Sequence, residues 1–195
     1  KVVEALVEFA RRNLIEIREQ TDVRKLWIEH GKAVGVKTAQ GNIRCGRIIL
    51  TAGAWTSLIK PLAVEVKPIR GQMICFRPKN PPLKHVIYGA GGYLVPRRDG
   101  RILAGATVED VGFDKSVTES AVKSLNSIAL EILPALDNLK ITERWSGLRP
   151  FCSDGFPVLG GLLGIDNVTL ATGHYRNGIL LAPVTANIMA DHLSG

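Results

Sequence analysis

The chain has 195 residues, enough for one large domain or two small ones, and 46% of them are apolar, enough for a buried core. The net charge of +7 permits nucleic-acid binding, but the basic residues are scattered singly or in pairs, so no nucleic-acid partner is expected. No apolar run is long enough to span a bilayer, and the first residues do not form a signal peptide.

The first part of the chain predicts one helix followed by short strands. Apolar residues recur at helical spacing over residues 2–14, and alternating patterns with His-Gly and Gln-Gly turns predict strands after them. The expected strands cover residues 15–17, 23–29, 33–39 and 42–53. The run Ile48-Ile49-Leu50 is apolar enough for a strand buried on both faces.

The middle of the chain, residues 64–142, predicts a different module. Long strands alternate there with Gly-rich or charged turns, and a helix is expected from Thr118 to Leu133. The helix should direct its apolar side chains inward, namely Val122, Leu125, Ile128, Ala129 and Ile132. This pattern predicts a mostly antiparallel sheet with a helix on one face, inserted between the first and last parts of the chain.

The last part of the chain predicts a Gly/Pro-rich loop after Trp145, a strand over residues 167–173 and a final helix. The inward-facing residues of that helix are expected to be Leu181, Val184, Ile188 and Met189. Pro183 should be tolerated because the first turn of a helix needs few backbone donors.

The cysteines give no sign of a metal site or a disulfide framework. Cys45, Cys75 and Cys152 are far apart, with no CxxC pair and no Cys/His cluster. Three free thiols are typical of a reducing compartment, so a cytoplasmic location and the absence of a bound metal are predicted.

A polar turn, Gly173 to Gly178, opens the last helix. Its Asn-Gly pair would leave unpaired N–H groups at the helix N-terminus, where the helix dipole favours an anion or an electron-rich ring. A ligand site is therefore predicted at this turn. The alternative is simple helix capping, with His174 and Arg176 in solvent.

Arg149 is a second candidate, because it lies between a leucine and a proline in a stretch poor in charge. A guanidinium held among apolar groups is costly without an anionic partner. A substrate carboxylate, bound in a bidentate fork, is one such partner. Asp154 is the alternative, and would make the arginine part of a structural salt bridge.

Two further segments could contribute to a site. Tyr93 follows two glycines at the head of a strand and could present its hydroxyl to a pocket, although a core or surface tyrosine would have the same pattern. The stretch TAGAW, Thr51 to Trp55, follows a buried strand with small residues that allow a ligand to approach the backbone. A tight turn followed by a packed tryptophan is the alternative for this stretch.

Several common catalytic motifs are absent from the sequence. It contains no Ser-His-Asp order, no metal-ligand spacing, no P-loop and no G-x-G-x-x-G. The chain therefore carries no dinucleotide-binding fingerprint of its own.

Five motifs, taken in order, carry a resemblance to a known family. They are TAGAW, IRGQM, GYLVPRRDGRILAGAT, WSGLRPFCSDGFPVLG and ATGHYRNGILLAP. Together they closely resemble the glycine oxidase branch of the D-amino-acid oxidase family of FAD enzymes, over essentially all 195 residues. The N-terminal G-x-G-x-x-G unit of that family is missing, so the chain looks like the C-terminal half to two-thirds of such an enzyme.

The resemblance and the predicted elements together imply an α+β or α/β fold with two domains. Residues 1–63 and 143–195 would form an incomplete FAD-binding, Rossmann-like domain. Residues 64–142 would form the inserted substrate-binding domain, with its antiparallel sheet and one helix.

The resemblance also implies roles for individual residues. Arg149 would clamp the substrate carboxylate, Tyr93 would line the same pocket, and Arg176 would lie at the edge shared by flavin and substrate. Non-covalent FAD would be contacted by Thr51, Ala52, Gly53, Trp55, Gly173, His174, Tyr175, Arg176, Asn177, Gly178, Ile179 and Leu180. Cys152 is expected to be unreactive, because the cysteine that attaches flavin in some sarcosine oxidases has a different spacing.

The implied reaction is oxidative deamination of glycine or another small amine. Hydride would pass from the substrate to the flavin, the imine would hydrolyse or serve thiamine biosynthesis, and dioxygen would reoxidise the flavin to give peroxide. The isolated chain is expected to be inactive, because most pyrophosphate contacts lie upstream. The alternatives are a D-amino-acid dehydrogenase, a sarcosine oxidase, or a non-catalytic, flavin-free binding module; a homo-oligomer is possible in each case.

Overall fold

The structure is a computed structural model that describes residues 2–194. The chain divides into two compact units. Unit 1 comprises Lys1–Ile49, Leu58–Leu62 and Gly161–Thr169, and unit 2 comprises Leu50–Ser57, Ala63–Gly160 and Leu170–Gly195. Within the described part of the chain, no helix is long and apolar enough to cross a membrane.

Unit 1 begins with the helix α1 (Val2–Arg12), whose apolar side chains lie on one side but are not buried. The antiparallel sheet that follows has the order β1-β2-β3 and contains β1 (Val23–Glu29), β2 (Lys32–Thr38) and β3 (Gly41–Arg44). The prediction of the helix and of the strands over residues 23–29 and 33–39 is confirmed.

Three predictions for this part of the chain are wrong. Residues 15–17 do not form a strand; they follow Leu14, which has a φ of 57° and is 94% exposed, so the chain turns there instead of pairing. The expected strand over residues 42–53 is interrupted, and its apolar run forms the short strand β4 (Ile48–Leu50). Ile49 is 47% exposed, so β4 is buried on one face and not on both.

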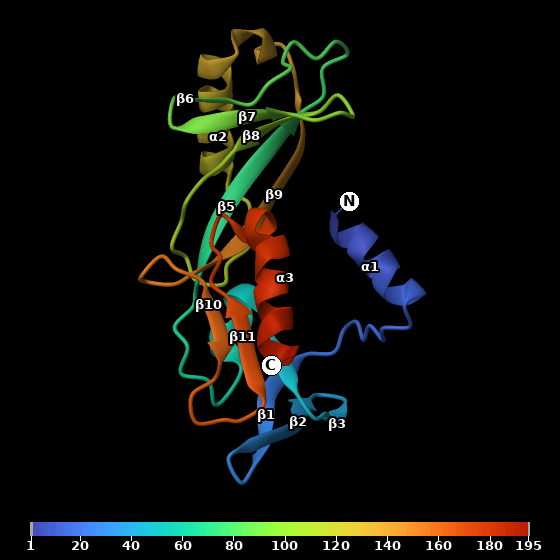
Figure 1. The fold of residues 1–195 in the computed structure, drawn as a ribbon. Coiled ribbons are helices and arrows are strands. Elements are labelled where there is room, and N and C mark those ends of the chain that lie inside the picture. Colours follow the sequence, from blue (N-terminus) through green and yellow to red (C-terminus); the bar gives the residue numbers. More distant parts are fainter. Residues whose placement is uncertain (1, 195) are drawn as a thin grey trace. The chain divides into compact units, whose positions relative to one another are not determined.

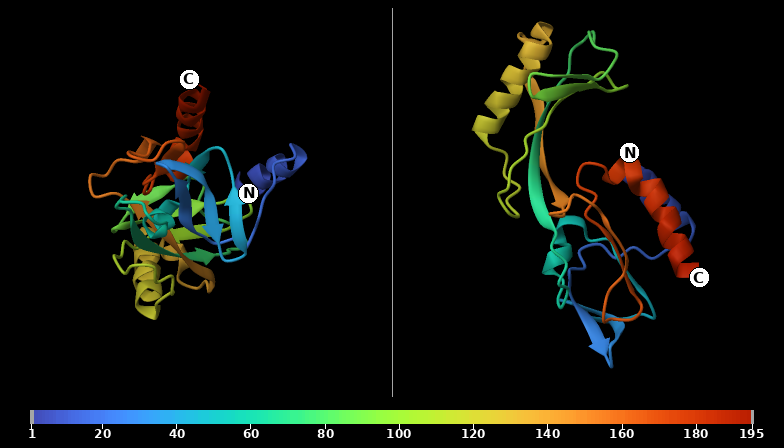
Figure 2. Two further views of the ribbon diagram at one scale, coloured as in Figure 1. Left: turned by 90° about the horizontal axis from the view of Figure 1, so that it is seen from below. Right: turned by 60° about the vertical axis from the view of Figure 1, so that its left-hand side comes forward.

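The main sheet of unit 2 has five antiparallel strands in the order β6-β7-β8-β5-β9. Its strands are β5 (Lys67–Phe76), β6 (Ile87–Gly89), β7 (Gly92–Pro96), β8 (Ile102–Gly105) and β9 (Ile141–Phe151). The two long strands β5 and β9 run side by side, as Figure 2 shows. The antiparallel sheet of the middle module is thus confirmed.

The helix α2 (Glu119–Ile132) covers one face of this sheet (Figure 1). Thr118 caps it, because its Oγ1 accepts a hydrogen bond from the N–H of Ala121 at 3.3 Å. Val122, Leu125 and Ala129 are buried against the strands, as predicted. Ile74, Phe76, Leu94 and Ile102 complete the centre of this core. The short 3-10 helix η2 (Pro134–Leu136) follows.

The first part of the predicted loop after Trp145 is instead the second half of β9, whereas residues 152–157 form a turn as expected. Residues Ile141–Phe151 pair with almost the whole of β5, including the stretch with Gly147, Arg149 and Pro150. Pairing with a long neighbouring strand therefore overrides the turn preference of glycine and proline. The correction is important for function, because it puts Arg149 on a strand.

The remaining elements are a three-stranded sheet and the last helix. The sheet has the order β10-β11-β4, with β10 (Val158–Gly161) and β11 (Val168–Thr172). The last helix is α3 (Gly178–Ser194), which follows β11. The 3-10 helix η1 (Gly53–Leu58) lies between β4 and β5 in the chain. Helices together with antiparallel sheets confirm the α+β class, whereas the division into cofactor and substrate domains at residues 63 and 143 stays a prediction.

Two predictions about α3 need correction. Met189 is buried and Leu181 is half-buried, but Val184 and Ile188 are 48% and 45% exposed, so these two do not face a core. Pro183 lies inside the helix, beyond its first turn. The free donors of the first turn therefore do not explain how this proline is tolerated.

Candidate active site

Arg149 lies near the end of β9, opposite Ile69 of β5. Its Nη1 donates hydrogen bonds to the carbonyl oxygen of Thr107, at 3.1 Å, and to that of Arg70, at 3.4 Å. Among residues 2–194, Arg149 forms no ion pair with a carboxylate. A half-buried guanidinium that is bound only to neutral carbonyls keeps its capacity to bind an anion.

Asp154 is not the partner of Arg149. It is exposed, and its Oδ1 accepts a hydrogen bond from the N–H of Phe156 at 3.0 Å, which stabilises the turn after β9. The structural salt bridge that the sequence left open is therefore not formed in the structure.

The guanidinium of Arg149 packs against the backbone of Gly71 in β5. A Cβ atom added at Gly71 would overlap the guanidinium of Arg149, so this end of the side chain lies directly on the backbone of β5. This close approach has a signal in the sequence, because a glycine inside a strand often marks a place where another group contacts the backbone. The motif IRGQM contains this glycine, for which no role was predicted.

A cavity of about 700 Å³ adjoins Arg149. This volume is typical of small-molecule sites. The glycine-rich turn 89–92, Ala106 and Val108 form part of its wall. Its polar lining consists of Tyr88, Tyr93, Arg149, Arg176 and Asn177. The structure therefore brings the three predicted catalytic residues, Tyr93, Arg149 and Arg176, to one cavity, together with Asn177 of the predicted cofactor set.

Tyr93 lies on β7, opposite Gly105 of β8. A Cβ atom added at Gly105 would lie 3.0 Å from the hydroxyl oxygen of Tyr93, so the tyrosine ring extends across this glycine. The ring of Tyr88 is 5.5 Å away and tilted. Tyr93 is half-buried in the cavity wall, and it is neither a core residue nor a freely exposed one.

The turn before α3 is fastened to the end of β9. The N–H of Tyr175 donates to the carbonyl oxygen of Pro150 at 2.8 Å, and His174 forms an isolated β-bridge with Phe151. The rings of Phe151 and Tyr175 meet edge to face at 5.1 Å. These contacts follow Arg149 directly in the chain, and they bring Arg176 to the same cavity.

The N-terminus of α3 is open. The carbonyl of Asn177 accepts the first helical hydrogen bond, from the N–H of Leu181 at 2.8 Å, so the N–H groups of residues 178–180 have no acceptor within the helix. The apolar side chains of Ile179 and Leu180 are 71% and 78% exposed. Free N–H groups beside exposed apolar side chains fit an aromatic ring that carries partial negative charge.

The capping alternative placed His174 in solvent, but the structure does not. His174 is half-buried, and its Nε2 lies 2.9 Å from Oγ1 of Thr185 on α3. Burial lowers the pKa of this imidazole, which favours its neutral form. His174 therefore connects the turn to the helix as a neutral hydrogen-bonding group.

Gly173 is buried and has a φ of +79°, a conformation that favours glycine. A Cβ atom at this position would overlap the Sγ of Cys152. Cys152 is 4% exposed, and burial, aided by the charge of Asp154, raises the pKa of its thiol. A protonated, buried thiol is a poor nucleophile, which supports the expectation that Cys152 is unreactive.

Replacing Gly173 with alanine is expected to lower the free energy of unfolding by about 1–3 kcal/mol for the positive φ, and by a similar amount for the overlap with Cys152. Thermal or urea denaturation would measure the loss. Gly155→Ala is the matched control, because Gly155 has a φ of +78° but open space around its Cβ position. Equal losses in the two variants would contradict the predicted overlap.

The stretch TAGAW connects to the turn through β11. The carbonyl of Gly53 accepts hydrogen bonds from the hydroxyls of Thr56, at 2.8 Å, and Thr172, at 3.1 Å, and Thr172 directly precedes Gly173. Trp55 is 45% exposed, with its ring centroid 6.2 Å from that of Phe113. None of Thr51, Ala52, Gly53 and Trp55 lines the cavity beside Arg149. Their predicted contact with the cofactor stays a prediction.

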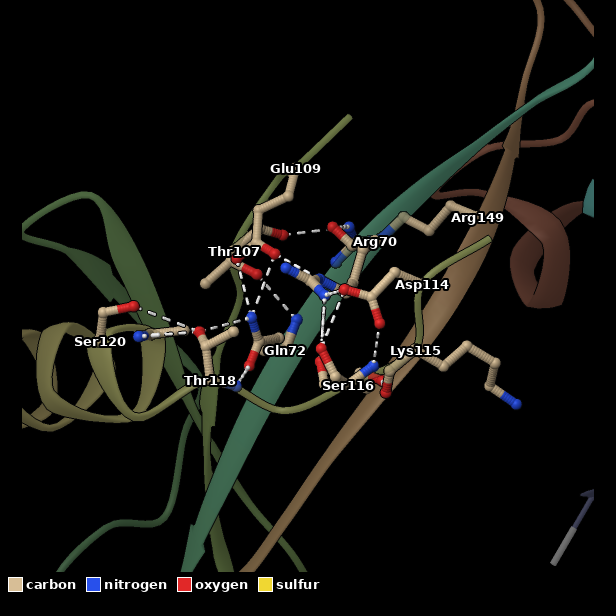
Figure 3. Close-up of polar contacts among 12 residues, drawn as sticks. Arg70, Gln72, Thr107, Glu109, Asp114, Lys115, Ser116, Thr118, Ser120 and Arg149 are labelled. Carbon is tan, nitrogen blue, oxygen red and sulfur yellow. Dashed lines mark hydrogen bonds and ion pairs between the residues drawn. The ribbon is translucent and has the colours of Figure 1, made fainter. Parts of the chain in front are cut away.

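Sequence reasoning missed a second set of polar residues behind the cavity. Arg70 and Gln72 of β5 are buried and bind Glu109 (Figure 3). Their signal was an arginine and a glutamine at alternate positions of an otherwise apolar strand. Within residues 2–194, no cluster of three or more His, Cys, Asp or Glu side chains could hold a metal ion.

Comparison with known proteins identifies the class. The family described as FAD-dependent oxidoreductases, abbreviated DAO, matches residues 1–192. The chain therefore belongs to this family of FAD-dependent oxidoreductases, as its sequence motifs predicted.

Individual relatives show which members of the family the chain is similar to. The chain is 44% identical to the glycine oxidase of Pseudomonas aeruginosa over 195 aligned residues, which cover 98% of the chain and 52% of that protein. It is 43% identical to the bifunctional protein ThiO/ThiG of a Nostoc species, over 91% of the chain and 27% of that protein. The crystal structure of glycine oxidase from Bacillus cereus superimposes with a TM-score of 0.88 at 34% identity, covering 96% of the chain and 54% of that structure. The chain thus spans about half the length of the glycine oxidases it matches.

Proposed function

We propose that the chain is the C-terminal portion of an FAD-dependent oxidase that deaminates glycine or another small amino acid. The observation that carries the proposal is Arg149, a half-buried guanidinium that faces the cavity without a carboxylate partner among residues 2–194. Because a planar guanidinium matches a carboxylate in a two-point fork, the α-carboxylate of an amino acid is the ligand it suits best.

The other cavity residues would complete substrate recognition. The hydroxyl groups of Tyr88 and Tyr93 are able to donate to the same carboxylate or accept from the substrate amine. Arg176 and Asn177, which directly precede α3, also line this cavity. Fixing the carboxylate at Arg149 would set the orientation of the Cα–H bond, the contribution to rate that positioning supplies.

The residues at the start of α3 fit the flavin ring system. The free N–H groups of residues 178–180 and the exposed Ile179 and Leu180 would hold it, with Gly173 allowing the close turn that precedes them. When bound, FAD would supply the two-electron acceptor for the Cα–H hydride, and dioxygen would return it to the oxidised form with release of hydrogen peroxide. The positive end of the α3 dipole would favour negative charge on the ring.

The size of the cavity bears on the choice of substrate. A volume of about 700 Å³ exceeds what glycine alone needs, so the cavity supports small amino acids as a class. The similarity to glycine oxidases favours glycine within this class. A D-amino-acid dehydrogenase and a sarcosine oxidase are the alternative activities, and the imine from glycine would be available to thiamine biosynthesis.

The test is a visible absorption spectrum, recorded after FAD is added and the excess is removed. The full-length protein that contains this chain is expected to retain the flavin bands and to lose them when glycine is added without oxygen. Residues 1–195 alone are expected to retain no flavin, because the family resemblance implies that most pyrophosphate contacts lie outside these residues. A full-length protein that holds no flavin would refute the oxidase proposal and favour a flavin-free binding module. Faster bleaching by sarcosine or D-alanine than by glycine would favour an alternative activity.

A further inference from the structure

Arg70 is a buried cation with two carboxylate partners. It is 5% exposed, and its Nε donates to Oε2 of Glu109 at 2.5 Å while its Nη1 donates to Oδ2 of Asp114 at 2.5 Å. Nη1 also donates to the carbonyl oxygen of Ser116 at 3.2 Å. Figure 3 shows these side chains converging from β5 and from the segment that follows β8. Such burial of a charge is costly unless every partner is in place.

Gln72 extends the same network toward α2. It is fully buried, and its Nε2 donates to both carboxylate oxygens of Glu109, at 3.0 and 3.1 Å. Its Oε1 accepts from the N–H of Thr118, the cap of α2, at 2.8 Å. Burial alone would raise the pKa of Glu109, but hydrogen bonds from Arg70, Gln72 and Thr107 outweigh it and keep the pKa below its usual value. Glu109 is therefore ionised in this network.

The network lies on the face of β5 that is turned away from Arg149. Successive side chains of a strand point to opposite faces, so Arg70 and Gln72 share one face and Gly71 belongs to the other. The guanidinium of Arg149 lies on Gly71, and Arg70 is not among the residues that line the cavity. Arg70 therefore does not touch a ligand bound there.

The segment that Arg70 holds does reach the cavity. Arg70 and Glu109 exchange two backbone hydrogen bonds, of 2.9 and 3.0 Å, and the N–H of Gln72 donates to Oγ1 of Thr107 at 2.8 Å. These bonds fix residues 107–109 beside β5. The carbonyl of Thr107 then accepts from Arg149 at 3.1 Å, and Val108 lines the cavity.

We infer that Arg70 is a positioning residue for Arg149, an inference that rests on the proposed function. Through Glu109 and Asp114, Arg70 holds residues 106–116 against β5. This segment presents the Thr107 carbonyl that orients the guanidinium of Arg149 for a carboxylate ligand. Arg70 acts through the segment and makes no contact with the substrate.

The test uses the full-length protein and the variant Arg70→Lys. Lysine keeps the charge, but its single ammonium lacks the fork that reaches two carboxylates in fixed directions. Hydrogen exchange is expected to be faster for the amides of residues 107–116. The dissociation constant of acetate, a minimal carboxylate probe measured by calorimetry, is expected to rise roughly tenfold to hundredfold, the scale of a misplacement of about 1 Å.

Arg101→Lys is the matched control. Arg101 also binds two carboxylates, Asp99 at 2.8 Å and Glu143 at 3.2 Å, but neither belongs to residues 106–116, so Arg101 does not hold the segment that carries Thr107. A purely structural role would lower thermal stability without changing acetate affinity, and this is the result expected for the control. Glu109→Gln, which keeps the shape of the side chain and removes its charge, serves as a second variant if Arg70→Lys does not fold.

Three outcomes decide the inference. Faster exchange at residues 107–116 together with weaker acetate binding supports it. Unchanged exchange, or acetate binding as tight as in the unsubstituted protein, overturns it while leaving the proposed function intact. No acetate binding by the unsubstituted protein would overturn the proposed role of Arg149, and the inference about Arg70 with it.

Discussion

Replacing Arg149 with methionine in the full-length protein is expected to lower kcat/KM for glycine by about 10²- to 10³-fold. Methionine removes the cation but keeps much of the length of the side chain, so the loss would reflect the carboxylate contact. Loss of one partner from a desolvated charge pair commonly has an effect of this size. Steady-state oxygen consumption at several glycine concentrations would measure it and separate KM from kcat.

Two further variants sharpen the test of Arg149. Arg149→Lys keeps the charge without the two-point fork, so its activity should lie between those of the unsubstituted protein and of Arg149→Met. Arg144→Met is the control, because Arg144 lies on the same strand but is exposed and pairs with Glu119. Activity of Arg149→Met within threefold of the unsubstituted protein would refute its role in carboxylate binding.

Replacing Gly71 with alanine is expected to disable the site while the fold survives. The added Cβ would overlap the guanidinium of Arg149, and all three of its nearest atoms belong to the movable end of that side chain. The guanidinium would therefore swing away and lose its hydrogen bonds to Arg70 and Thr107. A loss of about 10- to 100-fold in kcat/KM is expected from this displacement.

The control for Gly71 is its partner in register across the two strands. Gly147 lies opposite Gly71 on β9, but a Cβ atom added there would meet nothing within 4 Å. Gly147→Ala should therefore leave both activity and melting temperature close to those of the unsubstituted protein. Circular dichroism would verify that Gly71→Ala is folded. An active Gly71→Ala variant would mean that Arg149 does not need this support.

Much of the middle module could be predicted from local patterns. The alternating strands and the helical spacing of Val122, Leu125 and Ala129 determine the sheet and the helix that covers it. Arg149 and Tyr93 could also be singled out, because each is polar in apolar or glycine-rich surroundings. The structure then brings them to one cavity through β7 and β9, a proximity that no local pattern contains.

Other features depend on partners that are distant in the sequence. The carboxylates that bind Arg70 lie 39 and 44 residues further along the chain, so no spacing rule could connect them. Residues 146–151 contain the glycine and proline of a typical loop, yet β5 pairs with them and makes them a strand. For Val184 and Ile188 the apolar spacing indicates which residues share a face of α3, but it does not say what covers that face.

Three consecutive residues of β5, Arg70, Gly71 and Gln72, have roles on opposite faces of the strand. Arg70 and Gln72 belong to the buried network, and Gly71 carries the guanidinium of Arg149. Insertion or deletion of a single residue before this triplet would invert the facing of everything beyond it, because side chains alternate along a strand. A bulky arginine or glutamine would then occupy the place where Arg149 rests, and a glycine would replace a member of the buried network. Changes in length should accordingly be tolerated in the turns at either end of β5 and not within the strand. The ten residues of β5 therefore have a fixed length, because Arg149 rests on one face of the strand and the Arg70 network lies on the other.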